Sequence, residues 1–233
     1  MFENETKKKL SKLKKYLPIF IACPYTRAIF LGGSVSLGTA KKESDIDLFV
    51  VSKNNRVWLN KFLMTLAACV IGERRTQKKL ADKFCFNVFL SDSNPSLPHQ
   101  DRIGADFYRN LLPVWSENEN EVKKFWEANS WIKKYFDISP ASQKNIFERK
   151  NILADSARLF LEKNLDIAGL GFVLEKISFK LQNKYLKNRL KKSCAKLPEE
   201  YDFFVSPDLI AYHFPISNYY RELKRLDSEN LYK

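Results

Sequence analysis

Two aspartates, Asp45 and Asp47, are the residues whose type and spacing suggest chemistry most directly. They alternate with Ile46 and Leu48 in an apolar run that continues to Val51. Side chains alternate between the two faces of a strand, so both carboxylates project from one face and the apolar residues from the other, buried face. Two neighbouring carboxylates repel each other unless a cation lies between them. Mg²⁺ is the expected cation, because it takes oxygen ligands and keeps positions for water and phosphate.

A glycine-rich turn precedes the aspartate pair by about a dozen residues. Gly32, Gly33 and Ser34 directly follow an apolar run at residues 28–31. Glycines let the backbone approach a phosphate, free N–H groups at the start of a helix point toward it, and the Ser34 hydroxyl adds a donor. The pattern therefore predicts a strand, a glycine turn, a short helix and a second strand around a metal-bound phosphate. The alternative is a surface turn with two solvated aspartates.

The turn and the second strand together resemble the signature of the DNA polymerase β-like nucleotidyltransferase superfamily. The matching residues are Gly32-Gly33-Ser34 and Ser44-Asp45-Ile46-Asp47-Leu48, and the resemblance spans about residues 26–116. It implies that an acceptor hydroxyl attacks the α-phosphorus of a nucleoside triphosphate (NTP), that pyrophosphate leaves, and that Asp45 and Asp47 hold two Mg²⁺ ions. The acceptor can be RNA, a protein or a small molecule. The residues expected to bind the nucleotide lie in or after the turn: Gly32, Gly33, Ser34, Lys41, Lys42 and Ser44.

The predicted strand at 84–90 decides whether binding leads to catalysis. Members of the superfamily place a third carboxylate on a neighbouring strand, where it binds metal and accepts a proton from the attacking hydroxyl. Alternation predicts one face of Phe84, Phe86, Val88 and Leu90 and an opposite face of Cys85, Asn87 and Phe89. Asn87 then stands in the position of the third acid, with an amide that can ligate a metal but cannot accept a proton. Three alternatives remain open: Asp92 supplies the acid, the predicted register is wrong, or the protein binds nucleotide or RNA without turnover.

The elements that position these residues follow from hydrophobic periodicity. It predicts helices at 3–17, 54–70, 101–110, 118–135, 143–165 and 168–192, and a short edge strand or turn at 111–116. The tail is expected to be extended at 203–205 and helical after Ser206. We therefore predict an α/β (α+β) fold in which residues 1–116 form a small mixed-sheet catalytic domain with an N-terminal basic helix. Residues 117–233 are expected to form a helical domain with an aromatic tail.

The charge of the chain favours an anionic partner. Forty Lys and Arg residues against 27 Asp and Glu give a formal net charge of +13, which suits RNA or nucleotides. The predicted helix at 168–192 has a strongly basic face, made by Lys176, Lys180, Lys184, Lys187, Arg189, Lys191 and Lys192. Lysines four residues apart repel each other, so this face is the best candidate for an RNA track. The alternative is the solvated outer face of a helical bundle.

The four cysteines predict a reducing compartment. Cys23, Cys69, Cys85 and Cys194 are widely scattered and form no C-x-x-C pair. They are therefore expected to be reduced core cysteines of a cytoplasmic protein, and not zinc ligands or a disulfide framework. The N-terminus lacks the apolar region of a signal peptide, and no apolar run approaches the length of a membrane span.

Overall fold

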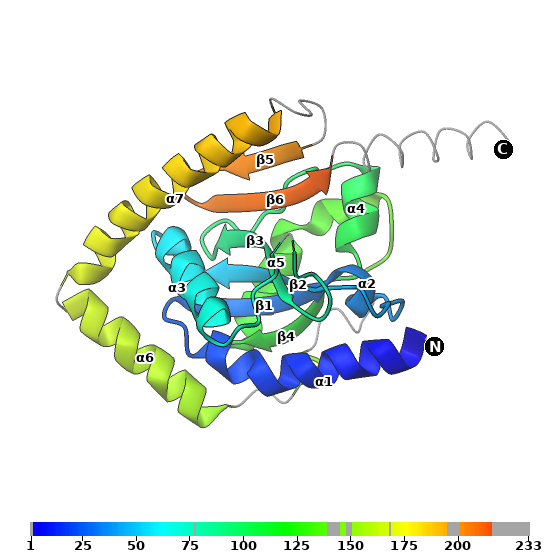
Figure 1. The fold of residues 1–233 in the computed structure, drawn as a ribbon, viewed down its shortest axis with the longest axis horizontal. Helices are drawn as coiled ribbons and strands as arrows, with labels where there is room; N and C mark the ends of the chain where they lie inside the picture. Colours follow the sequence, from blue (N-terminus) through cyan, green and yellow to red (C-terminus); the bar gives the residue numbers. More distant parts are fainter. Residues whose placement is uncertain are drawn as a thin grey trace, which may run out of the picture.

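A single mixed sheet of six strands organises the fold in a computed structural model, which describes residues 2–76, 78–138, 145–147, 151–167, 169–194 and 201–215 (Figure 1). The strand order is β4-β1-β2-β3-β6-β5. β2 and β3 are parallel, and the other neighbouring pairs are antiparallel. The strands are β1 (Thr26–Gly32), β2 (Ile46–Ser52), β3 (Phe84–Ser91), β4 (Leu112–Ser116), β5 (Tyr201–Val205) and β6 (Leu209–Pro215). The predicted α/β class is confirmed, and β4 lies at an edge of the sheet as expected.

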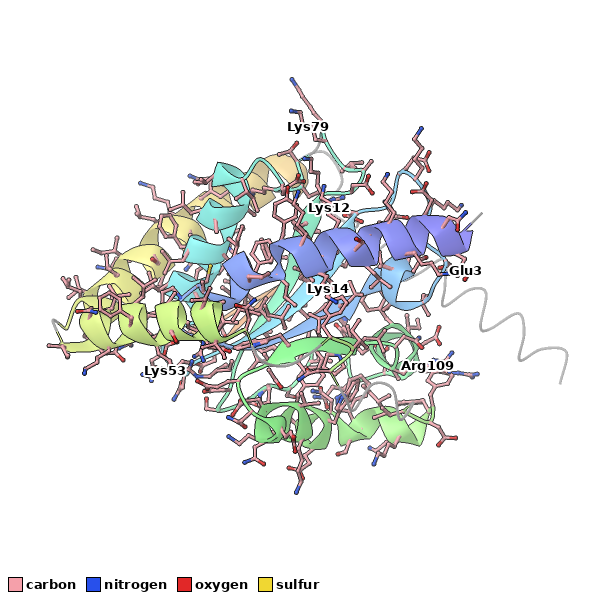
Figure 2. All side chains as sticks on the ribbon, turned by 90° about the horizontal axis from the view of Figure 1, so that it is seen from below. Glu3, Lys12, Lys14, Lys53, Lys79 and Arg109 are labelled. Carbon is pink, nitrogen blue, oxygen red and sulfur yellow. The ribbon has the colours of Figure 1, made fainter. Side chains whose placement is uncertain are left out.

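Helices cover both faces of this sheet. They are α1 (Phe2–Ile21), α2 (Gly33–Ser36), α3 (Val57–Val70), α4 (Arg102–Tyr108), α5 (Glu119–Ala128), the 3-10 helix η1 (Ser130–Lys134), α6 (Ile152–Ile167) and α7 (Leu170–Cys194). α1 and α3 contribute to an apolar cluster on one face, and α4, α5 and η1 contribute to a second cluster on the other. Figure 2 shows α5 and η1 on the side of the sheet away from α3. α6 and α7 meet at an angle at the left of Figure 1 and flank the sheet there.

The alternation predicted for β2 is confirmed. Ile46, Leu48 and Val50 lie in the cluster with α1 and α3, whereas Phe49 and Val51 lie in the cluster with α4 and α5. Because side chains alternate along a strand, Asp47 belongs to the same face as Phe49. The apolar residues thus fix the face from which the carboxylate projects.

The alternation predicted for β3 is wrong beyond Phe86. Leu48 pairs with Phe86 but the next residue, Phe49, pairs with Val88, so Asn87 is an extra residue in a β-bulge. A bulge reverses which face the following residues occupy. Accordingly Phe84 and Phe89 lie in the first cluster, with Phe86 packed against it, whereas Val88 and Leu90 lie in the second.

The C-terminal region is helical, as predicted, but it also adds two strands to the sheet. The helix expected after Ser206 is wrong, because residues 206–208 form the turn between β5 and β6. The Ser206 hydroxyl accepts hydrogen bonds from the N–H groups of Asp208 (3.2 Å) and Leu209 (3.0 Å). β6 then pairs with β3, from Val88 opposite Ala211 to Leu90 opposite Leu209. The domain boundary after residue 116 stays a prediction.

A square of charges, buried except for the partly exposed Glu117, fastens α6 to the sheet. Arg27 of β1 and Arg158 of α6 each contact both Glu117 and Glu162, at nitrogen–oxygen distances of 2.9–3.4 Å. We call these four residues the buried ion cluster. Glu162 also accepts a hydrogen bond from the backbone N–H of Tyr25 at 2.6 Å. Two cations therefore meet two anions, so the burial of the charges is compensated.

Three of the cysteines have described side chains, and all three are free. Cys23 and Cys85 are buried, but Cys69 is exposed, so the expectation of a core position is wrong for Cys69. The side chain of Cys194 lies outside the described residues. In the part of the chain that the structure describes, no helix is both long enough and apolar enough to span a membrane. The cytoplasmic location stays a prediction.

Candidate active site

Three neighbouring strands bring the glycine turn and the acidic residues together. Gly32, at the end of β1, pairs with Asp47 of β2, which in turn pairs with Cys85 of β3. β1 continues directly into α2 through Gly33, and Asp45 lies just before β2. The sheet therefore places the turn beside the carboxylates, as the sequence predicts.

Gly33 touches the carboxylate of Asp47 so closely that no side chain fits there. A Cβ atom on Gly33 would lie far inside the van der Waals radius of Asp47 Oδ2, and the Gly33 backbone has φ +66°, which favours glycine. Gly32 is also tightly packed, because a Cβ atom there would lie 2.7 Å from the Phe49 ring. The half-buried Ser34 makes no side-chain hydrogen bond with another described residue, so its hydroxyl is available to a ligand.

The loop between α2 and β2 carries the other predicted nucleotide-binding residues. Its backbone is held by Lys9 of α1, which is fully buried and donates to the carbonyl oxygens of Ser44 (2.8 Å) and Lys42 (3.3 Å). The Ser44 hydroxyl accepts a hydrogen bond from the N–H of Lys41 at 3.0 Å and so closes the loop. Lys41 and Lys42 are exposed. Hydrogen bonds therefore hold the backbone of this loop. The loop carries the exposed, cationic side chains of Lys41 and Lys42 a few residues before Asp45.

Asp47 is the end of a short chain of hydrogen bonds. The amide nitrogen of Asn87 donates to Asp47 Oδ1 at 2.7 Å, and the thiol of Cys85 donates to Asn87 Oδ1 at 3.0 Å. Asn87 and Cys85 are both buried. Asn87 therefore lies beside the pair as predicted, but the bulge brings it there, and its oxygen faces Cys85.

Burial raises the pKa values of Asp47 and Cys85, the two titratable groups in this series of hydrogen bonds. Burial and the negative charge of Asp45 raise the pKa of Asp47 to about 6, against the opposing effects of Asn87 and Arg75. Burial, followed by the charge of Asp47, raises the pKa of the Cys85 thiol to about 12. At neutral pH, Asp47 is therefore largely ionised and Cys85 keeps its proton.

The chain matches a known protein family. The nucleotidyltransferase domain family matches residues 5–192, most of the chain and all of the site described above. The chain belongs to this family. No curated protein matches the chain significantly. The family membership confirms the resemblance that the glycine turn and the aspartate pair indicate.

This nucleotidyltransferase-family chain has no third carboxylate beside the pair among its described residues. Asp92, the proposed substitute, lies beyond the other end of β3, seven residues or ~23 Å of strand from Cys85. It accepts a hydrogen bond from the N–H of Asn54 at 2.8 Å and lies 3.9 Å from Arg27. The alternative in which Asp92 supplies the acid is therefore wrong.

Arg75 is a site residue that the sequence reasoning missed. Its Nε lies 2.7 Å from Asp45 Oδ2, and its Nη1 donates to Cys85 Sγ at 3.8 Å. Arg75 stands in a basic run before β3 without helical or strand periodicity, so no local pattern singles it out. Cys85 was also missed as a site residue, although alternation already placed it on the side of Asn87.

The donor atoms fit one hard divalent cation. Single ligand atoms of Asp45, Asp47 and Cys85 lie within 4.8 Å of one another. The two carboxylates suit Mg²⁺, which would take its remaining ligands from water and phosphate. The protonated thiol of Cys85 is a poor ligand for that ion, because metals bind the thiolate. The residues that would hold the metal are therefore Asp45 and Asp47.

Proposed function

We propose that this protein transfers a nucleoside monophosphate from an NTP to a hydroxyl acceptor, with Mg²⁺ held by Asp45 and Asp47. One observation carries the proposal: in a chain of the nucleotidyltransferase domain family, the Asp47 carboxylate lies against Gly33 and has the Asp45 carboxylate within 4.8 Å of it. The carboxylates therefore lie beside a turn at the start of a helix, where backbone N–H groups can bind a phosphate.

Each site residue has a distinct part in this proposal. Asp45 and Asp47 hold the metal, which when bound neutralises phosphate charge and activates the acceptor oxygen. The Ser34 hydroxyl donates a hydrogen bond to the triphosphate, and Gly32 and Gly33, which have no side chains, let the turn that binds it lie directly against Phe49 and Asp47. The exposed side chains of Lys41 and Lys42 neutralise the leaving pyrophosphate. Ser44 holds the loop that carries them.

The proposal is tested by following the label from each of four α-phosphate-labelled NTPs. The full chain is incubated with Mg²⁺ and each NTP, with total RNA, with total protein, or with neither. We expect label to move to one acceptor class in the wild type and in Glu43→Gln, because Glu43 is an exposed acid two residues before Asp45. We expect no transfer by Asp45→Asn. Equal transfer by Asp45→Asn and the wild type would refute the assignment.

A second candidate is a protein of the same fold that binds nucleotide or RNA without turnover. Its support is the hydrogen-bonded Asn87 and the protonated Cys85 beside Asp47, because neither accepts a proton at neutral pH. The Asn87→Asp variant distinguishes the candidates. Activity that appears only in this variant would identify a degenerate site, whereas activity in the wild type would exclude one.

RNA is the polyanionic partner that the charge pattern favours. Lys176, Lys180 and Lys184 are exposed at four-residue spacing on α7, and none of the three has an ion-pair partner among the described residues. The side chains of Lys187, Arg189, Lys191 and Lys192 lie outside the described part. Binding through these lysines releases counterions, so RNA affinity should fall steeply with salt. A salt-independent affinity, or no loss of affinity in Lys180→Gln/Lys184→Gln, would exclude this track.

A further inference from the structure

Arg75 brings a fixed positive charge into the acidic site. Its Nε lies 2.7 Å from Asp45 Oδ2, and its side chain is about one-third exposed. The backbone N–H of Arg75 donates to the carbonyl of Phe84 at 2.9 Å, which ties the residue to the start of β3. The guanidinium is therefore held beside the carboxylates by the fold.

The position opposite Asp47 is neutral. Cys85 pairs directly with Asp47 across β2 and β3, and its thiol donates to Asn87. Asn87 in turn directs its NH₂ group, and not its oxygen, at Asp47. Two-metal sites bridge their ions with anionic ligands, since the ions lie only about 4 Å apart. Here two carboxylates face one guanidinium, and no third anion is present among the described neighbours.

We propose that Arg75 takes the place of one of the two metal ions, so that the site binds a single divalent cation together with the nucleotide. The guanidinium neutralises Asp45, and the cation is shared by Asp45 and Asp47. A second cation beside Asp45 Oδ2 would lie against the guanidinium and be repelled by it. The inference rests on the proposed function in one respect: the phosphates of a bound nucleotide supply further ligands to the cation.

The number of bound ions tests this directly. Mn²⁺, which is paramagnetic, replaces Mg²⁺, and free Mn²⁺ is measured by electron paramagnetic resonance with the full chain and an ATP analogue that has a methylene group between the α- and β-phosphates. We expect one Mn²⁺ in total per chain in the complex with the analogue, shared by the carboxylates and the phosphates. Two such ions in the wild type would overturn the proposal.

Removing the Arg75 guanidinium should increase the affinity of the site for divalent cations. We expect Arg75→Gln to bind Mn²⁺ at least about tenfold more tightly than the wild type, and the double variant Arg75→Gln/Asn87→Asp to take a second ion. Arg74→Gln is the matched control, because Arg74 is the exposed neighbour and loses the same charge. A Mn²⁺ affinity of Arg75→Gln equal to that of Arg74→Gln would contradict the proposal. If Arg75→Gln does not fold, the number of Mn²⁺ ions bound by the wild type tests the proposal without it.

The outcome is separable from that of the proposed function. One Mn²⁺ per chain without any nucleotidyl transfer would support the single-ion site and refute transfer. Transfer that requires two ions would support the proposed function and refute the role of Arg75. No Mn²⁺ binding by the wild type would refute both.

Discussion

Two clusters of charge lie at opposite ends of β1, and they are balanced differently. In the buried ion cluster, two arginines meet two glutamates, and each arginine contacts both. At the other end, the Arg75 guanidinium contacts Asp45, which lies beside Asp47. Each glutamate of the first cluster contacts two arginines, whereas in the second cluster only Asp45 has an ion-pair partner among the described residues and Asp47 has none.

This difference separates a structural role from a functional one. Buried charges that are fully paired hold elements together, and removing one partner leaves the other charge buried and uncompensated. Carboxylates that remain under-compensated cost stability, and they persist where a ligand supplies the missing charge. We therefore assign the buried ion cluster to fastening α6 onto the sheet and the acidic site to binding a cation and phosphates.

The largest stability effect should follow from breaking the balanced cluster. Glu162→Gln leaves Arg27 and Arg158 buried with one carboxylate between them, so we expect a loss of about 3–5 kcal/mol in the free energy of unfolding by urea. Asp155→Asn, also on α6 and 3.7 Å from Arg158 but partly exposed, is the control and should cost less than about 1 kcal/mol. Equal losses in the two variants would remove the distinction between the clusters.

A smaller stability effect, with a loss of ligand, is expected from Gly33→Ala. The new methyl group would collide with Asp47 Oδ2 at a residue of positive φ, so we expect a loss of about 1–3 kcal/mol and much weaker Mn²⁺ binding. Gly38→Ala is the matched control, because Gly38 also has positive φ but nothing lies within 4 Å of the added atom. Gly38→Ala should lose stability and keep its metal. Normal Mn²⁺ affinity in Gly33→Ala would show that the turn does not shape the site.

The smallest effect concerns the under-compensated carboxylate itself. Because the pKa of Asp47 is raised to about 6, the folded protein binds a proton more tightly than the unfolded chain does. Between pH 4 and pH 6 this contribution to stability is present at the acid end and is lost as the pH rises. Asp47→Asn should remove that dependence and raise stability at pH 7 by roughly 1–2 kcal/mol. Urea unfolding at several pH values without metal measures it, and an unchanged pH profile in the variant would contradict the assignment.

Local chemistry explains what the sequence could predict. The alternation of Asp45 and Asp47 with Ile46 and Leu48 fixes one strand, and the Gly33 turn fixes the approach to it, so these residues needed no tertiary information. The incorrect prediction of a helix after Ser206 has a related cause. A serine hydroxyl that accepts two N–H bonds caps a helix or closes a turn equally well, and the pairing of β6 with the distant β3 decides between them.

The missed features depend on geometry between distant segments. The bulge at Asn87 has no signature in the run from Phe84 to Ser91, because every residue around it is apolar on either face. The contact of Arg75 with Asp45 depends on the path of the segment before β3, which periodicity does not describe. The pairing of Asp47 with Cys85 follows from the parallel register alone.

One measurement tests the central claim most directly: the rate of pyrophosphate release from the NTP at saturating Mg²⁺ by Asp47→Asn, compared with the wild type. The substitution keeps the size of the side chain and removes the charge that holds the metal. We predict a rate lower by about 100-fold or more, with the urea unfolding midpoint retained or raised. Wild-type turnover by Asp47→Asn would contradict the account of this site.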